Sequence, residues 1–338
     1  MTVPCAPLQP TLDFFVDRLG FRVETIFPAD EPRTASLSGH GIRLRLAPGV
    51  GDPGTLRLPC ERAGEVLTAP NGTRVELVDL DPPIDLAKFA PQFLITRHGE
   101  GPGEGVGRAG MIYRDLIPGR LGGRYIASQI SIPEGGPVAD WVHFHKIRFQ
   151  LIFCRRGWAR LVYEDQGEPF LMEAGDCVLQ PPRIRHRVLE SSPGFEVVEI
   201  GCPALHETLA DHDMDLPTGS VAPGRDYGGQ LFLRHVAAIS PWTPHGGFER
   251  RDTGVARATR GIAEVHVLRP AGVEHLPAAT NAGELLFGFM LDGSAVLASR
   301  GRHDLGPADA FVIPPGEIWA LDAVSADANV LIVASATV

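Results

Sequence analysis

An internal repeat runs through the last two thirds of the chain, and it limits the available folds more than any other feature of the sequence. Residues 114–136 align without gaps to residues 251–273 and share an Arg-Asp pair, a proline and a glycine at matching places. Further on, "LIFCRRGWARL" pairs with "FGFMLDGSAVL", and "AGDCVLQPPRIRH" pairs with "PADAFVIPPGEIW". Each copy is a series of short strand patterns separated by turns, which the 39 glycines and 30 prolines favour over long helices. We therefore predict two similar all-β units.

The sequence around the repeat suggests five parts. The glycine-rich run "GEGPGEGVGRAG" reads as a linker. Its end, "GVGRAG", matches a dinucleotide-binding fingerprint, but the following "MIYRDLIP" reads as strand and turn, so we interpret the match as chance. The segment "ALHETLADHDM" has the pattern of one short helix. The predicted parts are an accessory module (1–82), a linker (83–110), a first β unit (111–204), a connection with a short helix (205–246) and a second β unit (247–338).

Charge and apolar patterning exclude several classes of partner. A net charge of −10 without a basic tract argues against nucleic acid. The sequence has no run of about 18 apolar residues that would predict a transmembrane helix, and "MTVPCAPLQP" lacks the basic and apolar regions of a secretory signal. The five cysteines are scattered without CxxC spacing, which indicates reduced thiols. We expect a cytoplasmic protein that binds neither nucleic acid nor membranes.

The stretch "WVHFHKIRFQLIFCRRG", residues 141–157, places two histidines one residue apart on a predicted strand. Residues i and i+2 of a strand point to the same face, so His143 and His145 project together and can share one ion. Gln150 is an odd number of residues from both, so a bend or bulge must intervene if it is to join them. His186 follows two prolines on a later strand, and the hairpin with its turn at "DQGEP" can bring it back beside the pair.

These residues resemble the two sequence motifs of the cupin superfamily. The first motif comprises Gly136, His143, His145, Gln150 and Gly157, and the second comprises Gly175, Pro182 and His186. The resemblance implies a jelly-roll β-barrel that holds one divalent metal ion through His143, His145, Gln150 and His186. The expected fold is mainly β, with two cupin-type jelly-roll barrels (a bicupin) and an N-terminal α+β module of βαβββ type. The alternative is that the histidines are ordinary core or surface residues, and the fit of four residues across two segments argues against it.

The glutamine departs from the family's pattern, because most members have glutamate there and only some have glutamine. Three neutral imidazoles and one neutral amide leave the double charge of the ion uncompensated. Such a site is expected to bind metal less tightly, to polarise a ligand more strongly and to favour an anionic substrate. Mixed nitrogen and oxygen ligation suits Fe, Mn, Zn, Ni or Co, and the sequence does not choose among them.

The second copy of the repeat tests the first. Leu286 aligns with Gln150, Trp319 aligns with His186, and residues 279–282, which contain no histidine, fall where the first pair stands. The second unit is therefore expected to keep the barrel and to lack the metal. It would serve packing, oligomerisation or the shaping of the pocket mouth. A less favoured interpretation is that it binds a separate organic ligand, with Trp319 as a stacking surface.

Charged residues flank the predicted metal ligands and could meet a substrate or remain solvated. The basic ones are Arg114, Arg120, Arg124, Lys146, Arg148, Arg183 and Arg185. Proton donors or acceptors could be Tyr125, Glu196 and Glu199. In "FEVVEIG" alternation puts Phe195, Val197 and Glu199 on one face and Glu196 on the other, so at most one glutamate faces inward. The catalytic candidates we select are Glu199, Tyr125, Arg124 and Arg148.

The N-terminal region resembles a single module of the vicinal oxygen chelate superfamily, which includes glyoxalases and extradiol dioxygenases. The residues that carry this resemblance are "LDFFVDRLGFRVE", with a helical apolar face and Gly20 as its C-cap, and "APNGTRVELVD". The resemblance would make Glu76 a metal ligand. However, such sites need two modules, and no histidine stands on a strand before the first helix. We therefore expect a structural or interaction role, unless a second chain supplies the partner module.

Together these features predict a metal-dependent cupin enzyme that acts on a small oxygenated, anionic substrate. The reaction would be that of a dioxygenase or of a redox-neutral isomerase or lyase. The alternative is a non-catalytic protein that contains the metal and binds or senses a small molecule. We also expect a homodimer.

Overall fold

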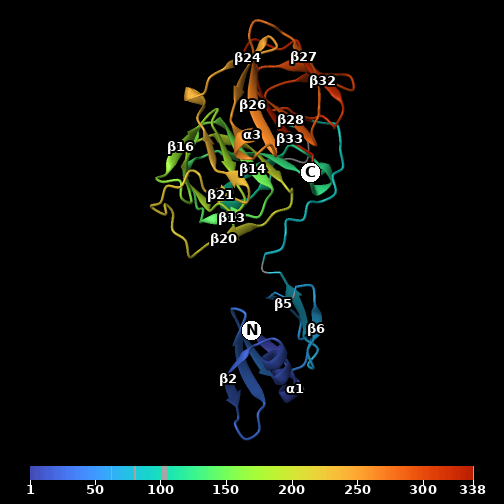
Figure 1. Ribbon diagram of the computed structural model, residues 1–338, viewed down its shortest axis with the longest axis vertical. Helices are drawn as coiled ribbons and strands as arrows, with labels where there is room; N and C mark the ends of the chain where they lie inside the picture. The colour runs from blue at the N-terminus through green and yellow to red at the C-terminus, as the bar shows by residue number, and fades with distance from the viewer. Residues whose placement is uncertain (62, 80, 101–104, 338) are drawn as a thin grey trace. The chain divides into compact units, whose positions relative to one another are not determined.

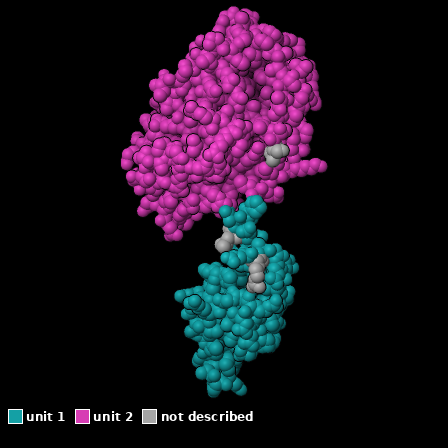
Figure 2. Space-filling view, viewed as in Figure 1, with its two compact units in different colours: residues 1–83 teal, residues 84–338 magenta. Residues whose placement is uncertain are grey.

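The computed structural model describes residues 1–61, 63–79, 81–100 and 105–337 (Figure 1). The chain divides into two compact units, residues 1–83 and residues 84–338 (Figure 2). Strands dominate both units, as predicted (Figure 1). Within the described ranges, no helix combines the length and apolar character needed to cross a bilayer.

The first unit begins with a βαβββ arrangement. Its elements are β1 (Thr2–Pro4), α1 (Leu8–Asp13), the π-helical turn Phe14–Arg18, β2 (Arg22–Phe27), β3 (Thr34–Gly39) and β4 (Ile42–Ala47). The sheet order is β1-β4-β3-β2, and β1 lies parallel to β4. Leu12 and Phe15 of the predicted helical face are buried, and Gly20 ends the helix with a φ of +73°, which favours glycine. The predicted element order is therefore confirmed.

A three-stranded sheet completes the first unit, with the order β5 (Thr55–Pro59), β7 (Arg74–Val78), β6 (Val66–Thr68). Glu76 on β7 pairs with Arg57 at 3.3 Å and with Arg74 at 3.1 Å. His40 Nε2 lies 2.6 Å from the carbonyl oxygen of Leu19. The structural or interaction role expected for this region stays a prediction. The likeness to the vicinal oxygen chelate superfamily stays a prediction.

The first barrel is built from two sheets. One has the order β23-β17-β14-β19-β11-β10-β9, and the other has the order β16-β15-β18-β13-β20, with β12 paired to β18. Two short helical turns, Arg108–Gly110 and α2 (Arg120–Gly123), lie near its start. The strands are β9 (Gly105–Val106), β10 (Ile112–Asp115), β11 (Ile126–Ile132), β12 (Gly136–Pro137), β13 (His143–His145), β14 (Phe149–Arg156), β15 (Trp158–Tyr163), β16 (Phe170–Glu173), β17 (Cys177–Gln180), β18 (His186–Ser191), β19 (Phe195–Cys202), β20 (Thr208–Ala210) and β23 (Leu233–His235).

The second barrel repeats this topology. Its sheets have the orders β24-β25-β26-β33-β28-β31-β8 and β27-β32-β29-β30, so β31-β28-β33-β26-β25 corresponds to β17-β14-β19-β11-β10. The internal repeat is thus confirmed as a repeat of strand order. The elements are β8 (Leu94–Thr96), β24 (Thr243–His245), β25 (Phe248–Asp252), α3 (Val255–Ala258), β26 (Ala263–Pro270), β27 (Leu276–Thr280), β28 (Leu285–Asp292), β29 (Ala295–Ala298), β30 (Arg302–Leu305), β31 (Ala310–Val312), β32 (Ile318–Asp322) and β33 (Asn329–Ser335).

The two barrels exchange edge strands. β8, which precedes the first barrel in sequence, pairs with β31 of the second, and β23, which precedes the second barrel, pairs with β17 of the first. The predicted linker 83–110 is therefore corrected, because residues 84–100 belong to the second compact unit and contain β8. Residues 101–104 of the glycine-rich run lie outside the described residues. The segment after "GVGRAG" is strand β10, as expected.

The predicted short helix at 204–214 is wrong. This segment contains β20, in which Thr208 lies opposite His145 on β13. The remainder of the predicted connection holds the hairpin β21 (Asp226–Tyr227) and β22 (Gln230–Leu231) and the 3₁₀ turn Ala237–Ile239. Pairing with the edge of β13 satisfies backbone groups that a short helix would have left unpaired at its ends, so tertiary context overrides the local pattern.

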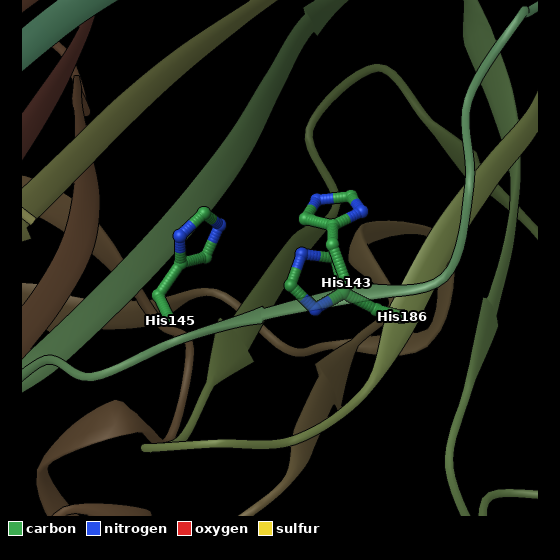
Figure 3. Close-up of side chains that lie close together, drawn as sticks. All are labelled: His143, His145 and His186. Carbon is green, nitrogen blue, oxygen red and sulfur yellow. The ribbon is translucent and has the colours of Figure 1, made fainter. Parts of the chain in front are cut away.

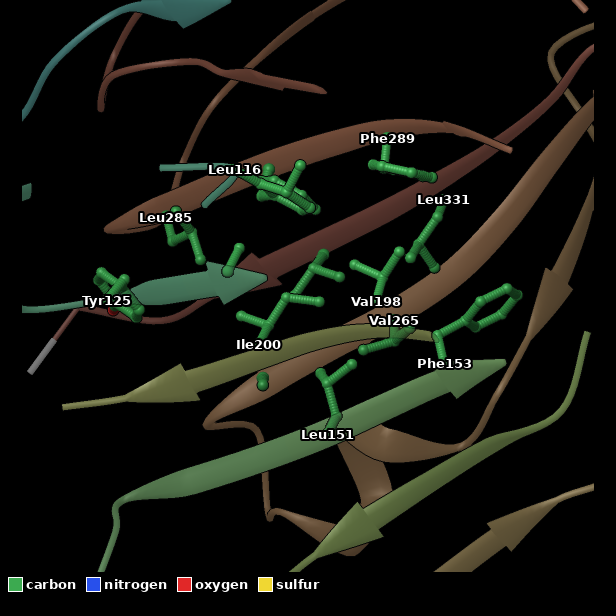
Figure 4. Packing of buried hydrophobic residues seen from close by; sticks show 14 of the residues in the cluster. Leu116, Tyr125, Leu151, Phe153, Val198, Ile200, Val265, Leu285, Phe289 and Leu331 are labelled. Carbon is green, nitrogen blue, oxygen red and sulfur yellow. The ribbon is translucent and has the colours of Figure 1, made fainter. Parts of the chain in front are cut away.

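The main core lies between the barrels. Alternation along β14 turns Phe149, Leu151 and Phe153 toward the second barrel and Gln150 and Ile152 toward the interior of the first. Figure 4 shows side chains of the first barrel packed with those of the second, including Val265, Leu285 and Leu331. This shared apolar layer makes residues 84–338 one rigid support for the interior of the first barrel.

Candidate metal centre

Three buried imidazoles meet inside the first barrel. His143 and His145 lie on β13, and His143 stands directly opposite His186 on β18. The ring centroids of His143 and His186 are 4.2 Å apart, and those of His145 lie 5.4 and 5.5 Å from the other two. One ring nitrogen from each residue lies within 4.8 Å of the others. Figure 3 shows the three rings side by side, so β13 and β18 bring the three predicted histidines together.

Backbone carbonyls fix the orientation of all three rings. The Nδ1 atoms of His143, His145 and His186 lie 2.8, 3.0 and 3.0 Å from the carbonyl oxygens of Trp141, Glu207 and Ile184. A carbonyl oxygen only accepts, so each Nδ1 carries the proton and each Nε2 keeps a lone pair. This is the arrangement that metal-binding histidines use.

Burial keeps these imidazoles neutral. It lowers the pKa of His143 and His186, and it lowers the pKa of His145 to about 3. Metal ligands must be neutral imidazoles, so the rings are ready to coordinate over a wide pH range.

Gln150 borders the same cavity from the other sheet. Residues 146–148 carry the chain from β13 to β14, which supplies the bend that the sequence required. Gln150 Nε2 donates a hydrogen bond to Glu199 Oε1. Gln150 Oε1 is buried and makes no hydrogen bond to any described residue. A buried acceptor without a partner costs free energy unless a cation or water satisfies it, so this oxygen fits a fourth ligand.

The cavity has a volume of about 270 Å³ and mostly apolar walls. Its apolar lining comes from Met111, Ile126, Ile130, Ile132, Ile152, Leu161, Met172, Val188, Phe195 and Val197. Glu199 also borders it, and Glu196, on the opposite face of β19, pairs instead with Arg155 at 2.6 Å. The alternation predicted for this strand is thus confirmed, and Glu199 is the inward glutamate. Burial raises the pKa of Glu199, whereas the hydrogen bond from Gln150 and the nearby His206 and Arg108 act in the opposite direction and favour the carboxylate form.

Arg108 is a site residue that the sequence did not reveal. Its Nη2 donates to His143 Nε2 at 3.2 Å, and its guanidinium pairs with Asp140 and lies 5.3 Å from the centre of the Trp141 ring. Asp140 is buried and also accepts from the backbone amides of Trp141 and Val188 at 2.9 and 3.0 Å. Arg108 stands 35 positions before the first histidine, in the run interpreted as a linker, so no local spacing could link it to the site.

His206 is a second residue that the sequence did not reveal. Its ring centroid lies 5.1 Å from that of His145, and its Nδ1 lies 2.9 Å from the carbonyl oxygen of Pro203. It borders the cavity from the segment that was predicted to be helical. Only the strand pairing of β20 with β13 brings this segment to the site.

Comparison with solved structures identifies the fold. A mutant of oxalate decarboxylase from Bacillus subtilis aligns with a TM-score of 0.54 and 11% identity, covering 75% of this chain and 78% of that one. Salicylate 1,2-dioxygenase from Pseudaminobacter salicylatoxidans aligns with a TM-score of 0.54 and 15% identity, covering 73% of this chain and 85% of that one. Both are bicupins. The chain has a bicupin fold. No family model and no curated protein matches the sequence.

Two residues predicted to be catalytic, Arg124 and Tyr125, do not border the cavity that contains the histidines. Arg124 Nε and Nη2 donate to Glu284 of the second barrel at 2.6 and 3.3 Å. Tyr125 Oη donates to Glu284 at 3.1 Å and lies 2.6 Å from Ser335 Oγ. Both residues are buried between the barrels and do not border the cavity, so their predicted catalytic role is corrected to a structural one.

Arg148 is also absent from the cavity wall among the described residues. Its amide donates to the carbonyl of Cys202 at 2.7 Å, and its own carbonyl accepts from the Gln230 side chain at 2.5 Å. The side chains of two other flanking arginines have partners outside the cavity. Arg114 donates to the carbonyl oxygens of Arg97 and Ala308, and Arg185 pairs with Asp211 at 3.0 Å. None of these three arginines lines the described cavity wall.

The second barrel of the bicupin is filled rather than hollow at the corresponding place. Ala279 lies opposite Trp319, as His143 lies opposite His186, so the alignment made from sequence is confirmed. Trp319 is 5% exposed, its ring lies 5.9 Å from that of Phe311, and Leu286 packs in the same cluster. The less favoured idea of Trp319 as an open stacking surface does not fit this burial.

Proposed function

We propose that the first barrel holds one divalent metal ion through Nε2 of His143, His145 and His186 and Oε1 of Gln150, and that the protein is an enzyme for a small oxygenated anion. One observation carries this proposal. Three neutral imidazoles are fixed through Nδ1 and share a small apolar cavity with an amide oxygen that has no hydrogen-bond partner among the described residues. Mixed nitrogen and oxygen ligation suits Fe, Mn, Zn, Ni or Co.

Arg108 supports an anionic substrate. Its Nη2 now donates to His143 Nε2, the lone pair that the ion would take, so metal binding would free this N–H for a substrate. The pair with Asp140 and the Trp141 ring would keep the guanidinium beside the site, where it could bind a carboxylate. The names of the two aligned structures, an oxalate decarboxylase and a salicylate dioxygenase, both refer to carboxylate compounds. In this chain, the support for an anionic substrate is the guanidinium of Arg108 at the cavity wall.

The remaining residues provide positioning and exclusion of water. A bound divalent ion would act as a Lewis acid toward two vicinal substrate oxygens. The apolar walls keep water out, which strengthens the attraction between Arg108 and a substrate carboxylate. Glu199 is the one predicted catalytic residue that borders the cavity. Two reaction classes suit this arrangement, O₂-dependent cleavage and redox-neutral enolisation, isomerisation or elimination.

Metal content and oxygen consumption test the proposal. Protein purified without added metal is subjected to elemental analysis, and O₂ uptake is measured against a panel of hydroxy-acids and β-diketones. Iron with O₂ uptake supports the dioxygenase, and zinc or manganese with substrate turnover but no uptake supports the isomerase or lyase. Metal without turnover of any compound favours the binding or sensor alternative. Protein that takes up none of these metals contradicts the proposal.

Arg108→Gln tests the substrate class separately. The variant is expected to raise KM for anionic substrates and to keep the metal content of the wild type. Arg160→Gln is the matched control, because Arg160 is exposed, pairs with Glu190 at 3.5 Å and does not border the cavity among the described residues. An unchanged KM in Arg108→Gln contradicts the assignment. The homodimer stays a prediction, which sedimentation velocity tests.

A further inference from the structure

The carboxylate of Glu199 lies directly behind the amide of Gln150. Both side chains border the cavity, and Gln150 is 3% exposed. Because the amide nitrogen donates to Glu199, the amide oxygen must point the other way. That oxygen, Gln150 Oε1, is the buried acceptor left without a hydrogen-bond partner by the described residues. The Glu199 carboxylate thus orients the Gln150 amide, with its nitrogen toward β19 and its oxygen away from β19.

Glu199 also decides the charge of the site. Among the described residues that line the cavity, the charged side chains other than histidine are Arg108, Arg187 and Glu199. Asp140, near His143, already pairs with Arg108. Glu199 therefore provides the one carboxylate of the described cavity wall, and it accepts a hydrogen bond from Gln150, a proposed metal ligand. Glu199 thus brings into the site the negative charge that a glutamate at position 150 would carry, but on the residue hydrogen-bonded to Gln150.

We propose that Glu199 is a positioning residue for the metal centre, which holds Gln150 with its oxygen toward the ion and supplies the negative charge that the four ligands lack. This inference rests on the metal centre proposed above. It replaces the expectation, made from the ligands alone, that the charge of the ion stays uncompensated. A carboxylate hydrogen-bonded to a ligand raises that ligand's donor strength and reduces its freedom to rotate.

A charge exchange between the two positions tests the inference. The variants are Glu199→Gln and the double variant Gln150→Glu with Glu199→Gln, which moves the carboxylate to the ligand position and the amide behind it. The control is Glu196→Gln, on the same strand but on the opposite face. Metal-free full-length protein is titrated with Co²⁺, and both the dissociation constant and the visible d–d spectrum are recorded. Tryptophan fluorescence in each sample verifies folding.

Glu199→Gln is expected to bind Co²⁺ about 10- to 100-fold more weakly and with an altered spectrum, because the amide of Gln150 loses its fixed orientation. The double variant is expected to regain most of the wild-type affinity, and Glu196→Gln is expected to keep it. A merely structural role of Glu199 would not give rescue by the exchange. Wild-type affinity in Glu199→Gln, or a folded double variant no better than the single one, overturns the inference and leaves the metal centre standing. If the wild-type protein binds no Co²⁺, both the proposed metal centre and the role of Glu199 are contradicted.

Discussion

The buried ion pair between the barrels gives a sharp prediction about stability. The side chains of Arg124 and Glu284 are 10% and 6% exposed, and two arginine nitrogens donate to the carboxylate. Glu284→Gln keeps the shape but removes the negative charge, so the arginine charge is left buried without compensation. Breaking one partner of such a pair costs about 3–5 kcal/mol, because the remaining charge keeps its desolvation penalty.

Replacing both partners should cost much less. In the double variant Arg124→Met with Glu284→Leu, no charge is buried and the volume is nearly kept, so most of the lost stability should return. Tyr125 keeps a partner in Ser335, whose Oγ lies 2.6 Å from its hydroxyl. The recovery distinguishes a penalty of uncompensated charge from a simple loss of packing.

Urea denaturation followed by tryptophan fluorescence is the assay. All 4 tryptophans lie within residues 84–338, so the signal reports the two barrels and not the N-terminal unit. With a slope of about 3 kcal/mol/M, a loss of about 4 kcal/mol lowers the midpoint by more than 1 M. Arg160→Ala, which removes an exposed pair, should leave the midpoint within error. A loss below about 1 kcal/mol in Glu284→Gln, or a double variant less stable than the single one, would refute the reasoning.

Three further predictions concern the site and the second barrel. His145→Ala should abolish metal binding, measured by elemental analysis, and leave the circular dichroism spectrum intact; normal metal content would count against the assignment. Burial lowers the pKa of His145 to about 3 in the folded protein, whereas an unfolded histidine has a pKa of about 6.5. Below about pH 6.5 the unfolded chain therefore binds a proton at this residue that the folded chain does not bind. Through His145 alone, the metal-free protein should lose about 2 kcal/mol of stability at pH 5. Urea midpoints against pH should fall less steeply in His145→Gln, and equal slopes would contradict the pKa. Gly288→Ala should cost about 1–3 kcal/mol or more, because its Cβ would lie 2.1 Å from the Phe311 ring, whereas Gly306→Ala, with open space around its Cβ, should be nearly neutral in the same denaturation assay.

The local sequence pattern was sufficient to predict the barrel and the three histidines inside it. The spacing of His143 and His145 fixed their common face, and the repeat fixed which residues of the second barrel replace them. The alternation in β19 fixed that only one glutamate faces inward, although it did not say which one. These features follow from strand periodicity, which depends on residues only a few positions apart.

The local sequence pattern did not predict which residues from distant segments come together in the folded chain. Arg124 and Tyr125 looked like neighbours of the site because they lead into the first barrel, yet they pack against Glu284, 160 residues away in sequence for Arg124. Arg108 and His206 entered the site from segments interpreted as linker and helix. Packing between the barrels decided the first case, side-chain contacts with Asp140 and His143 decided the place of Arg108, and the pairing of β20 with β13 decided that of His206.

The amino-acid sequence by itself determined the two-barrel plan, the one barrel that carries histidines and the faces on which they stand, because period-two alternation and an internal repeat are written in neighbouring residues. Tertiary structure alone decided that Arg108 and Glu199 complete the cavity and that Arg124 and Tyr125 do not, because these outcomes depend on contacts between segments that lie 35 to 160 residues apart in the chain.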